Sequence, residues 1–183
     1  MQLIYLVQHG DKEREPGDPG LTSAGRQQAA KAGRWLRSAG VRSLYSSPLR
    51  RAWQTAQGIA SVTGLEVVMD ARLRERLNWS AGSFADFAAE WSRSERNRDF
   101  VPAGGDSSRQ AGERLRAFVI EQSGMPGPVA AVTHGGVTRD LLRTLLGDDD
   151  VRVQQLGEDM PPCAITTVHD LGVTDIAVVR HLM

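Results

Sequence analysis

Short apolar runs alternate with amphipathic stretches along most of this chain. The run Leu3 to Val7 is wholly apolar, as expected for a strand that is buried on both faces. Three further segments are predicted as strands: Val41 to Tyr45, Leu65 to Met69 and Pro128 to Thr133. Strands that alternate with helices are typical of an α/β fold with a largely parallel sheet. We therefore expect a three-layer sandwich in which helices flank a mostly parallel central sheet.

Capping and stop residues mark the helices between these runs. Thr22 is a good N-cap for a helix that extends to about Ser38, with Gly40 as its stop. Ser47 as cap, with Pro48 at the first helical position, opens the next helix. The remaining expectations are an end to this second helix at Gly64, helices over 108–122 and 137–146, and β-rich segments over 164–169 and 174–181 around a turn at Gly172.

The segment from about 73 to 105 breaks the alternating pattern. It contains Trp79 and Trp91, a short helical stretch near Phe84 to Ser92, and a charged run from Arg93 to Arg98. An insertion or lid over an active site has this character, and a solvated face explains the charges equally well. Since no repeat or linker divides the chain, we expect residues 1–183 to form a single domain that carries this insertion.

Composition narrows the class of protein. The chain has 183 residues and a formal net charge of zero, which gives it no electrostatic preference for nucleic acid or for an anionic membrane. No segment has the pattern of a signal peptide or a transmembrane helix, so a cytoplasmic location is expected. The single cysteine, Cys163, excludes an intramolecular disulfide and a cysteine-based zinc site.

Two histidines occupy matching positions in the predicted fold. His9 directly follows the first strand and precedes Gly10, and His134 directly follows the 128–133 strand and precedes Gly135 and Gly136. Ligands of open parallel sheets bind beyond the carboxyl ends of the strands. If the two strands are neighbours, both imidazoles project into one crevice, where a helix N-terminus favours an anion. The other histidines, at positions 169 and 181, have no glycine loop beside them, and we interpret them as structural.

Two charged residues complete the candidate chemistry. Arg51 lies in the first turn of the helix after the second strand, where its guanidinium can bind phosphate oxygens, whereas Arg50 is turned toward solvent or a neighbouring helix. Glu75 follows the third strand and lies between two arginines. From its spacing alone, Glu75 is best interpreted as a surface salt-bridge partner.

Six short motifs, taken together and in this order, resemble the histidine phosphatase superfamily, which includes phosphoglycerate mutases and many small phosphatases. The motifs are His9-Gly10, Asp18 to Gly25 with Gln28-Ala29, Ser47 to Ala52 with Thr55-Ala56, Leu73 to Glu75, Gly104 to Ser107, and Thr133 to Gly136. The resemblance covers almost the full length of the chain.

The resemblance implies a role for each matching residue. His9 corresponds to the nucleophile, His134 to the second histidine, Arg51 to an arginine of the phosphate pocket and Glu75 to the proton donor, which replaces the interpretation from spacing. It also implies that Gln8, Gly10, Thr22 and Gly135 contribute to substrate binding. No metal ion and no cofactor is implied.

The sequence departs from the family at position 8. The family motif begins Arg-His-Gly, and here the arginine is replaced by Gln8. A glutamine amide donates a hydrogen bond without charge, and the loss of one charge-assisted bond of about 1.5–3 kcal/mol weakens phosphoryl binding by about ten- to a hundredfold. Lys12 and Arg14 are candidate substitutes, whereas Glu15, in roughly the place of a family asparagine, would repel phosphate.

The leading hypothesis is a phosphatase that hydrolyses phosphomonoesters, or protein phosphohistidine, through a phosphohistidine on His9. Two alternatives remain, a phospho-ligand binding protein with weakened catalysis and a phosphotransferase of the mutase type. The expected partner is a phosphorylated small molecule or phosphoprotein. The sequence leaves the identity of the substrate and the oligomeric state open.

Overall fold

A computed structural model describes residues 2–156 and 160–183 of the protein, and within them a six-stranded sheet forms the centre. The strands are β1 (Leu3–Gln8), β2 (Ser43–Ser46), β3 (Val67–Met69), β4 (Val129–Thr133), β5 (Ile165–His169) and β6 (Gly172–Val178). Their spatial order is β3-β2-β4-β1-β5-β6. The first four strands pair in parallel, and β5 and β6 extend the sheet in antiparallel fashion. The predicted mostly parallel sheet is confirmed.

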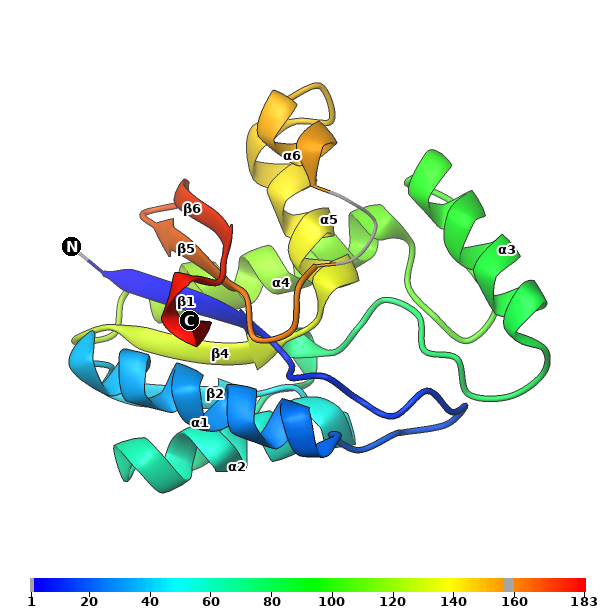
Figure 1. Ribbon diagram of the computed structural model, residues 1–183. Coiled ribbons are helices and arrows are strands. Elements are labelled where there is room, and N and C mark those ends of the chain that lie inside the picture. The colour runs from blue at the N-terminus through cyan, green and yellow to red at the C-terminus, as the bar shows by residue number, and fades with distance from the viewer. Residues whose placement is uncertain (1, 157–159) are drawn as a thin grey trace.

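Helices cover both faces of this sheet (Figure 1). One layer contains α1 (Ser23–Ser38) and α2 (Arg50–Thr63), and the other contains α4 (Ser108–Gln122) and α5 (Gly135–Leu146). Side chains alternate across β1, since Tyr5 and Val7 pack in the core of the first layer and Ile4 and Leu6 in the core of the second. The apolar run of β1 thus serves two cores at once, and the three-layer architecture is confirmed.

The register of β1 and β4 places the two candidate histidines next to each other. The strands are parallel neighbours, and Gln8 is paired with Thr133 at their carboxyl ends. The backbone N–H of His9 continues this ladder by donating to the carbonyl of Thr133 at 3.1 Å. The segments that follow β1 and β4 therefore leave the sheet side by side, beyond the carboxyl ends of the strands, which is where open α/β sheets bind ligands.

The predicted helix boundaries hold at α1 and are wrong at the start of α2. The Thr22 side chain accepts a hydrogen bond from the Gly25 N–H and caps α1 as predicted. Helix α2 begins at Arg50 rather than at Pro48, and the Leu49 side chain provides no cap. The carboxylate of Asp18, 32 residues earlier, accepts from the Arg50 N–H instead, at 2.9 Å. A long-range loop contact therefore replaces the local serine cap.

Several smaller expectations also required correction. Strands β2 and β3 each begin two residues later than predicted, and α5 begins two residues earlier, directly at Gly135. The turn between β5 and β6 is formed by Asp170 and Leu171, which both have positive φ angles of 47° and 63°, so it precedes Gly172. Three short elements were not predicted: α6 (Val151–Gln155), η1 (Ala71–Leu73) and η2 (Arg180–Leu182).

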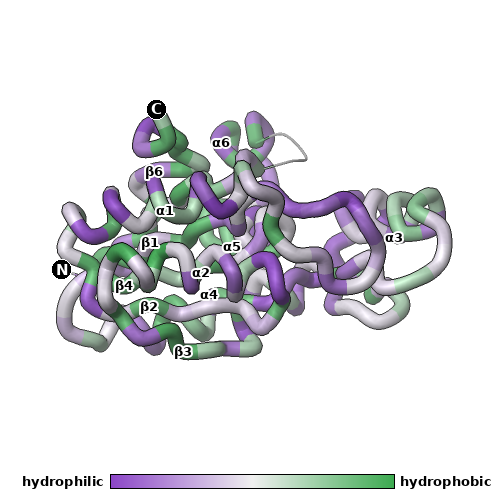
Figure 2. The backbone as a smooth tube through the Cα atoms, turned by 60° about the horizontal axis from the view of Figure 1, so that its bottom comes forward, coloured by the Kyte–Doolittle hydropathy of each residue, from purple (hydrophilic) through white to green (hydrophobic). Residues whose placement is uncertain are grey.

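The middle segment contributes one helix, α3 (Phe84–Arg96), which extends four residues beyond the expected end. It stands apart from the sheet, on the side toward which the carboxyl ends of β1 and β4 point (Figure 1). The tube in Figure 2 shows α3 at one extremity of the molecule, with apolar stretches on it. Arg98, at the end of the charged run, is buried, so a solvated face does not account for the whole run. In the parts of the chain that the structure describes, no helix is long and apolar enough to span a bilayer.

Candidate active site

His9 begins the loop that follows β1, and its ring is held in one tautomer. The Nδ1 atom lies 2.8 Å from the carbonyl oxygen of Gly10. Because a carbonyl oxygen only accepts, Nδ1 carries the proton and donates it. The Nε2 atom of the neutral ring is then left with a free lone pair, which is the form required of a nitrogen nucleophile.

The side chain of Gln8 contacts this same lone pair. Its amide nitrogen lies 3.3 Å from Nε2 of His9, and the amide is the donor of this hydrogen bond. Gln8 is buried, and its Oε1 atom has no hydrogen-bond partner among the described residues. A Cβ atom at Gly135 would lie 3.6 Å from that oxygen, in ordinary van der Waals contact, so Gly135 is a direct neighbour of the Gln8 amide.

His134 lies beside His9 and is completely buried. It is the N-cap residue of α5, and the two imidazole centroids are 5.3 Å apart with an angle of 59° between the ring planes. Nε2 of His134 forms a hydrogen bond of 2.7 Å with the hydroxyl of Ser47, which fixes the orientation of the ring. Its Nδ1 atom has no partner within residues 2–156 and 160–183.

Arg51 brings a positive charge to the two rings from the first turn of α2. Its side chain is buried, whereas Arg50 is exposed as predicted. The guanidinium donates from Nη1 to Oδ1 of Asn78 at 3.1 Å, and the carboxylate of Asp18 is 3.9 Å away. The Nε atom of Arg51 is buried and lacks a partner in the described part of the chain.

Burial and Arg51 keep both histidines neutral. Burial in the crevice, followed by the charge of Arg51, lowers the pKa of His9 from 6.5 to about 3. The same two causes hold the pKa of His134 well below its ordinary value, with a further contribution from His9. The strongest positive charge acting on both rings is therefore that of Arg51, and both imidazoles are neutral.

Glu75 reaches the crevice from the segment after η1, and it is anchored by backbone groups. Its carboxylate accepts hydrogen bonds from the N–H groups of Gly136 at 3.0 Å, Val137 at 2.8 Å and Arg76 at 2.9 Å. The interpretation as a surface salt-bridge partner does not hold, because the side chain is half-buried and bound to backbone. The N–H groups at the N-terminus of α5 are thus partnered by a side chain of the protein itself.

The first loop is held by contacts that explain several motif residues. The Gly10 N–H donates to the Thr55 hydroxyl at 3.0 Å, and the Asp11 N–H donates to Oε1 of Gln28 at 2.8 Å. A Cβ atom at Gly10 would lie 2.7 Å from the carbonyl oxygen of Gly25, so only glycine allows the loop to approach α1 this closely. The Thr22 hydroxyl is used in capping and in a 2.7 Å bond to Asp11, and its role in substrate binding stays a prediction.

A buried ion network lies behind Glu75. Arg76 is fully buried, donates to Asp140 on α5 at 2.7 Å, and also pairs with Glu95 on α3. Its guanidinium stacks over the ring of Trp91 at 4.1 Å from the centroid. This network fixes α3 to α5 and holds the backbone of residues 75 and 76 in place.

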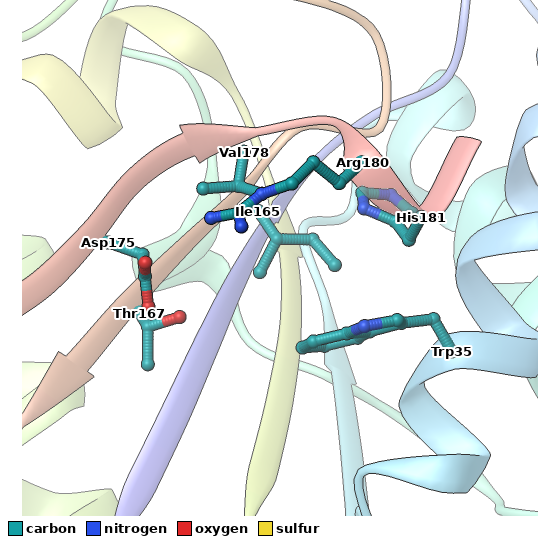
Figure 3. Close-up of a pocket in the computed structure, with 7 residues that line it drawn as sticks. All are labelled: Trp35, Ile165, Thr167, Asp175, Val178, Arg180 and His181. Carbon is teal, nitrogen blue, oxygen red and sulfur yellow. The ribbon is translucent and has the colours of Figure 1, made fainter. Parts of the chain in front are cut away.

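The remaining candidates lie at the edge of the site or away from it. Burial and the nearby Arg51 lower the pKa of Lys12, which places this lysine in the electrostatic range of the crevice, whereas Arg14 and Glu15 are exposed. His169 lies at the end of β5. His181 lines a separate cavity of about 300 Å³ together with Trp35, Arg180 and residues of β5 and β6 (Figure 3).

Sequence reasoning missed two polar residues of the site. The sequence pattern indicates Ser47 only as a helix cap, whereas its hydroxyl binds His134. Ser47 directly follows β2, just as the histidines follow β1 and β4, and this shared position could have identified it as a site residue. Asn78, which binds Arg51, gives no signal in the sequence. Asn78 reaches Arg51 only because the segment after η1 folds back to the start of α2.

Comparisons with known proteins show which proteins this chain is similar to. The chain is 30% identical, over 87% of its length and 90% of the other, to a 2,3-bisphosphoglycerate-dependent phosphoglycerate mutase of Brucella ovis. It is 29% identical to the structure of mycobacterial glucosyl-3-phosphoglycerate phosphatase in complex with VO₃, with a TM-score of 0.76 over 92% of this chain and 93% of that one. A phosphoserine phosphatase of Entamoeba histolytica, in complex with 3-phosphoglyceric acid, shares the fold at 23% identity with a TM-score of 0.77 over both full chains.

The family model of the histidine phosphatase superfamily (branch 1) matches residues 4–172, a range that includes every residue of the site described above. The chain belongs to the histidine phosphatase superfamily.

Proposed function

We propose that this protein hydrolyses phosphomonoesters through a covalent phosphohistidine on Nε2 of His9. One observation carries the proposal. Two buried nitrogen atoms around the histidine pair lack partners within the described residues, namely Nε of Arg51 and Nδ1 of His134, and both can donate a hydrogen bond. Buried polar groups are normally hydrogen-bonded, so a polar ligand is expected where two such atoms converge. A phosphoryl group carries both charge and hydrogen-bonding oxygens of the required kind.

In the first step, the lone pair on Nε2 of His9 attacks phosphorus opposite the leaving oxygen. The new P–N bond forms as the P–O bond to the leaving group breaks, and Glu75, entering this step protonated, gives its proton to the leaving oxygen. Arg51 and His134 stabilise the charge on the equatorial oxygens. The Nδ1–H of His9 remains on the Gly10 carbonyl, which stabilises the positive charge that develops on the ring.

In the second step, water cleaves the phosphohistidine. Glu75, now a carboxylate, takes a proton from a water molecule as its oxygen attacks phosphorus. The P–N bond breaks, and the electron pair returns to Nε2 of His9. The products are inorganic phosphate and the starting form of the enzyme, with Glu75 protonated again.

The similarity to a glucosyl-3-phosphoglycerate phosphatase over almost the whole chain supports hydrolysis. The similarity to a phosphoglycerate mutase keeps a second function in view, in which the phosphoryl group on His9 passes to an acceptor hydroxyl instead of to water. The first chemical step is the same for both. Incubation with 3-phosphoglycerate separates them, because a mutase yields 2-phosphoglycerate and a phosphatase yields inorganic phosphate.

The decisive experiment is trapping of the intermediate. A rapid quench with a ³²P-labelled phosphomonoester should give acid-labile, alkali-stable label on the protein, and His9→Ala should abolish both the label and phosphate release. His181→Ala serves as the matched control, because this histidine lies in a different cavity. Turnover by His9→Ala at the wild-type rate would exclude the proposed nucleophile. Phosphate binding without label or turnover would favour a binding protein.

A further inference from the structure

An uncommon share of the aromatic side chains lies in one row beside the crevice. The chain has four Trp, two Tyr and four Phe residues, and four of these form a continuous series that we call the aromatic row: Trp79, Phe84, Phe87 and Trp91. Successive ring centroids are 5.3, 5.9 and 5.9 Å apart. The last three rings are on one face of α3, since positions 84, 87 and 91 follow the helical period.

Both ends of the row touch segments that follow the two histidines. At one end, a Cβ atom at Gly136 would lie 2.4 Å from Cη2 of Trp91 and 2.7 Å from Oε1 of Glu75. The Trp91 ring and the proposed proton donor therefore meet at the start of α5. At the other end, the carbonyl of Trp79 accepts from the N–H of Gly17, in the loop after His9, at 2.8 Å. The aromatic row thus starts beside Glu75 at Trp91, and its other end belongs to a segment whose backbone is bonded to the loop after His9.

The row is rigidly anchored at its inner end and uncovered at its outer end. Trp91 is fixed by the guanidinium of Arg76 stacked on it and by the pairing of Arg76 with Glu95 on the same helix. Phe87 is half-buried, and Phe84 is 60% exposed. Neither apolar core of the protein includes these rings. A pre-positioned and partly exposed aromatic surface is suited to binding another apolar group.

We propose that the aromatic row binds the leaving group of the substrate, and that this group presents an aromatic or similarly flat apolar face. The proposal rests on the proposed function, because Glu75 marks the side on which the leaving oxygen departs. The carbon skeleton attached to that oxygen then extends from Glu75 past Trp91 and along Phe87 and Phe84. In this arrangement the predicted lid acts as a specificity surface for the organic part of the substrate.

A polar cavity on another side of Glu75 is the competing place for the leaving group. It has a volume of about 230 Å³ and includes Arg74, Asn78 and Asp106 in its lining. A leaving group with a carboxylate would need the charge of Arg74 there. Arg74, however, already holds both oxygens of Asp106, at 3.0 and 2.8 Å. Asp106 is shared with Arg114, which donates to it at 3.0 Å, so an anionic leaving group could bind Arg74 only by displacing a contact that joins two arginines. The aromatic row requires no such displacement and is therefore favoured.

The first test measures binding without turnover. Calorimetry compares 2-naphthylmethylphosphonate with methylphosphonate, two unreactive ligands that share the phosphonate group. Aromatic pairs contribute about 0.5–1.5 kcal/mol each, so contacts with two rings should make the naphthyl ligand bind about tenfold more tightly. Equal affinity for the two ligands in the wild-type protein would overturn the proposal.

Matched variants assign the preference to the row. In Phe84→Ala/Phe87→Ala, the ratio of the affinities for the naphthyl and methyl phosphonates should fall to about one. In Phe84→Leu/Phe87→Leu, which keeps apolar volume without the rings, the ratio should lie between that value and the wild-type ratio. Phe100→Ala is the control, because Phe100 lies in the same segment outside the row and packs under Arg93. A ratio that is unchanged in the alanine variant, with melting temperature retained, would also overturn the proposal.

A kinetic comparison separates this proposal from the function on which it rests. We expect kcat/KM for 2-naphthylmethyl phosphate, an alkyl ester like phosphoserine, to exceed that for phosphoserine about tenfold, and the excess to disappear in Phe84→Ala/Phe87→Ala. If both esters are hydrolysed at equal efficiency, the row proposal fails and the phosphatase stands. If the naphthyl phosphonate binds preferentially but no ester is hydrolysed, the row binds apolar groups and the proposed function fails.

Discussion

The amide nitrogen of Gln8 lies 3.3 Å from Nε2 of His9 and donates a hydrogen bond to the lone pair that would attack phosphorus. The nucleophile is therefore held in the correct tautomer from both sides, by the Gly10 carbonyl at Nδ1 and by Gln8 at Nε2. The contact also means that the Gln8 amide must turn away before Nε2 can reach a phosphoryl group. Gln8 is consequently expected to influence both substrate binding and the rate of attack.

Replacement of this glutamine tests its contribution directly. Gln8→Arg adds a charge where the phosphoryl group binds, and a charge-assisted hydrogen bond should lower KM for phosphomonoesters by about tenfold or more and speed turnover at low substrate concentration. Gln8→Met, which keeps the length without the amide, is the control and should raise KM. If kcat/KM of Gln8→Arg equals or falls below that of the wild-type protein, Gln8 is adapted to the substrate and does not impair catalysis.

The lowered pKa of His9 predicts how its ring titrates. With a pKa of about 3, the imidazole stays neutral through the ordinary histidine range near 6.5. An NMR titration should therefore show no change of the His9 ring signals near 6.5. Arg51→Gln removes the second-largest cause of the shift and should raise the midpoint. A wild-type midpoint near 6.5 would contradict the burial and charge described for the crevice.

The same histidines predict the direction of acid destabilisation. Their folded pKa values lie below the unfolded value of 6.5, so their contribution to stability is complete above 6.5 and is lost as the pH falls toward 3. For each histidine, the free energy of unfolding should decline by at most about 1.4 kcal/mol per pH unit in this window. Urea unfolding across the window should give a flatter profile for His9→Gln/His134→Gln. An unchanged slope would count against burial of neutral rings.

Glu75 is expected to matter most when the leaving group is poor. Glu75→Gln keeps an acceptor for the backbone bonds of α5 but cannot donate a proton to the leaving oxygen. General acid catalysis contributes about 10²–10⁴-fold, so alkyl phosphates should slow by this order, while formation of phosphohistidine from p-nitrophenyl phosphate should slow much less. Single-turnover quench measurements compare the two. Equal losses for both substrates would argue against Glu75 as the acid.

Arg76 should dominate the stability of the segment that carries Glu75. Arg76→Met leaves the fully buried carboxylate of Asp140 without its cation, which costs about 3–5 kcal/mol. Burial already raises the pKa of Asp140 to about 7, so the loss should be larger above that pH than below it, where the carboxyl is neutral. Arg116→Met, which breaks an exposed pair with Glu113, should cost about 1 kcal/mol or less. Denaturant unfolding that shows equal effects for the two variants would contradict the network.

The parts of the molecule that could be predicted depend on local pattern. The apolar run of β1, the Thr22 cap and the glycines after each histidine are features of adjacent residues, and they predicted the sheet and the meeting of His9 with His134. The cap of α2 could not be predicted in this way, because Asp18 reaches Arg50 across 32 positions. The anchoring of Glu75 was hidden for the same reason, since its partners are backbone groups of a helix about 60 residues later.

The separation of the aromatic row from both apolar cores has a consequence for evolution. Of the rings of α3, Trp91 is held by Arg76 of the ion network, and none of the three contributes to either core cluster. Substitutions at Phe84 and Phe87 therefore spare the packing that keeps His9 and His134 together. Under the two proposals made above, a lineage could exchange one substrate for another by substitutions at these positions while the phosphoryl-transfer chemistry is inherited intact.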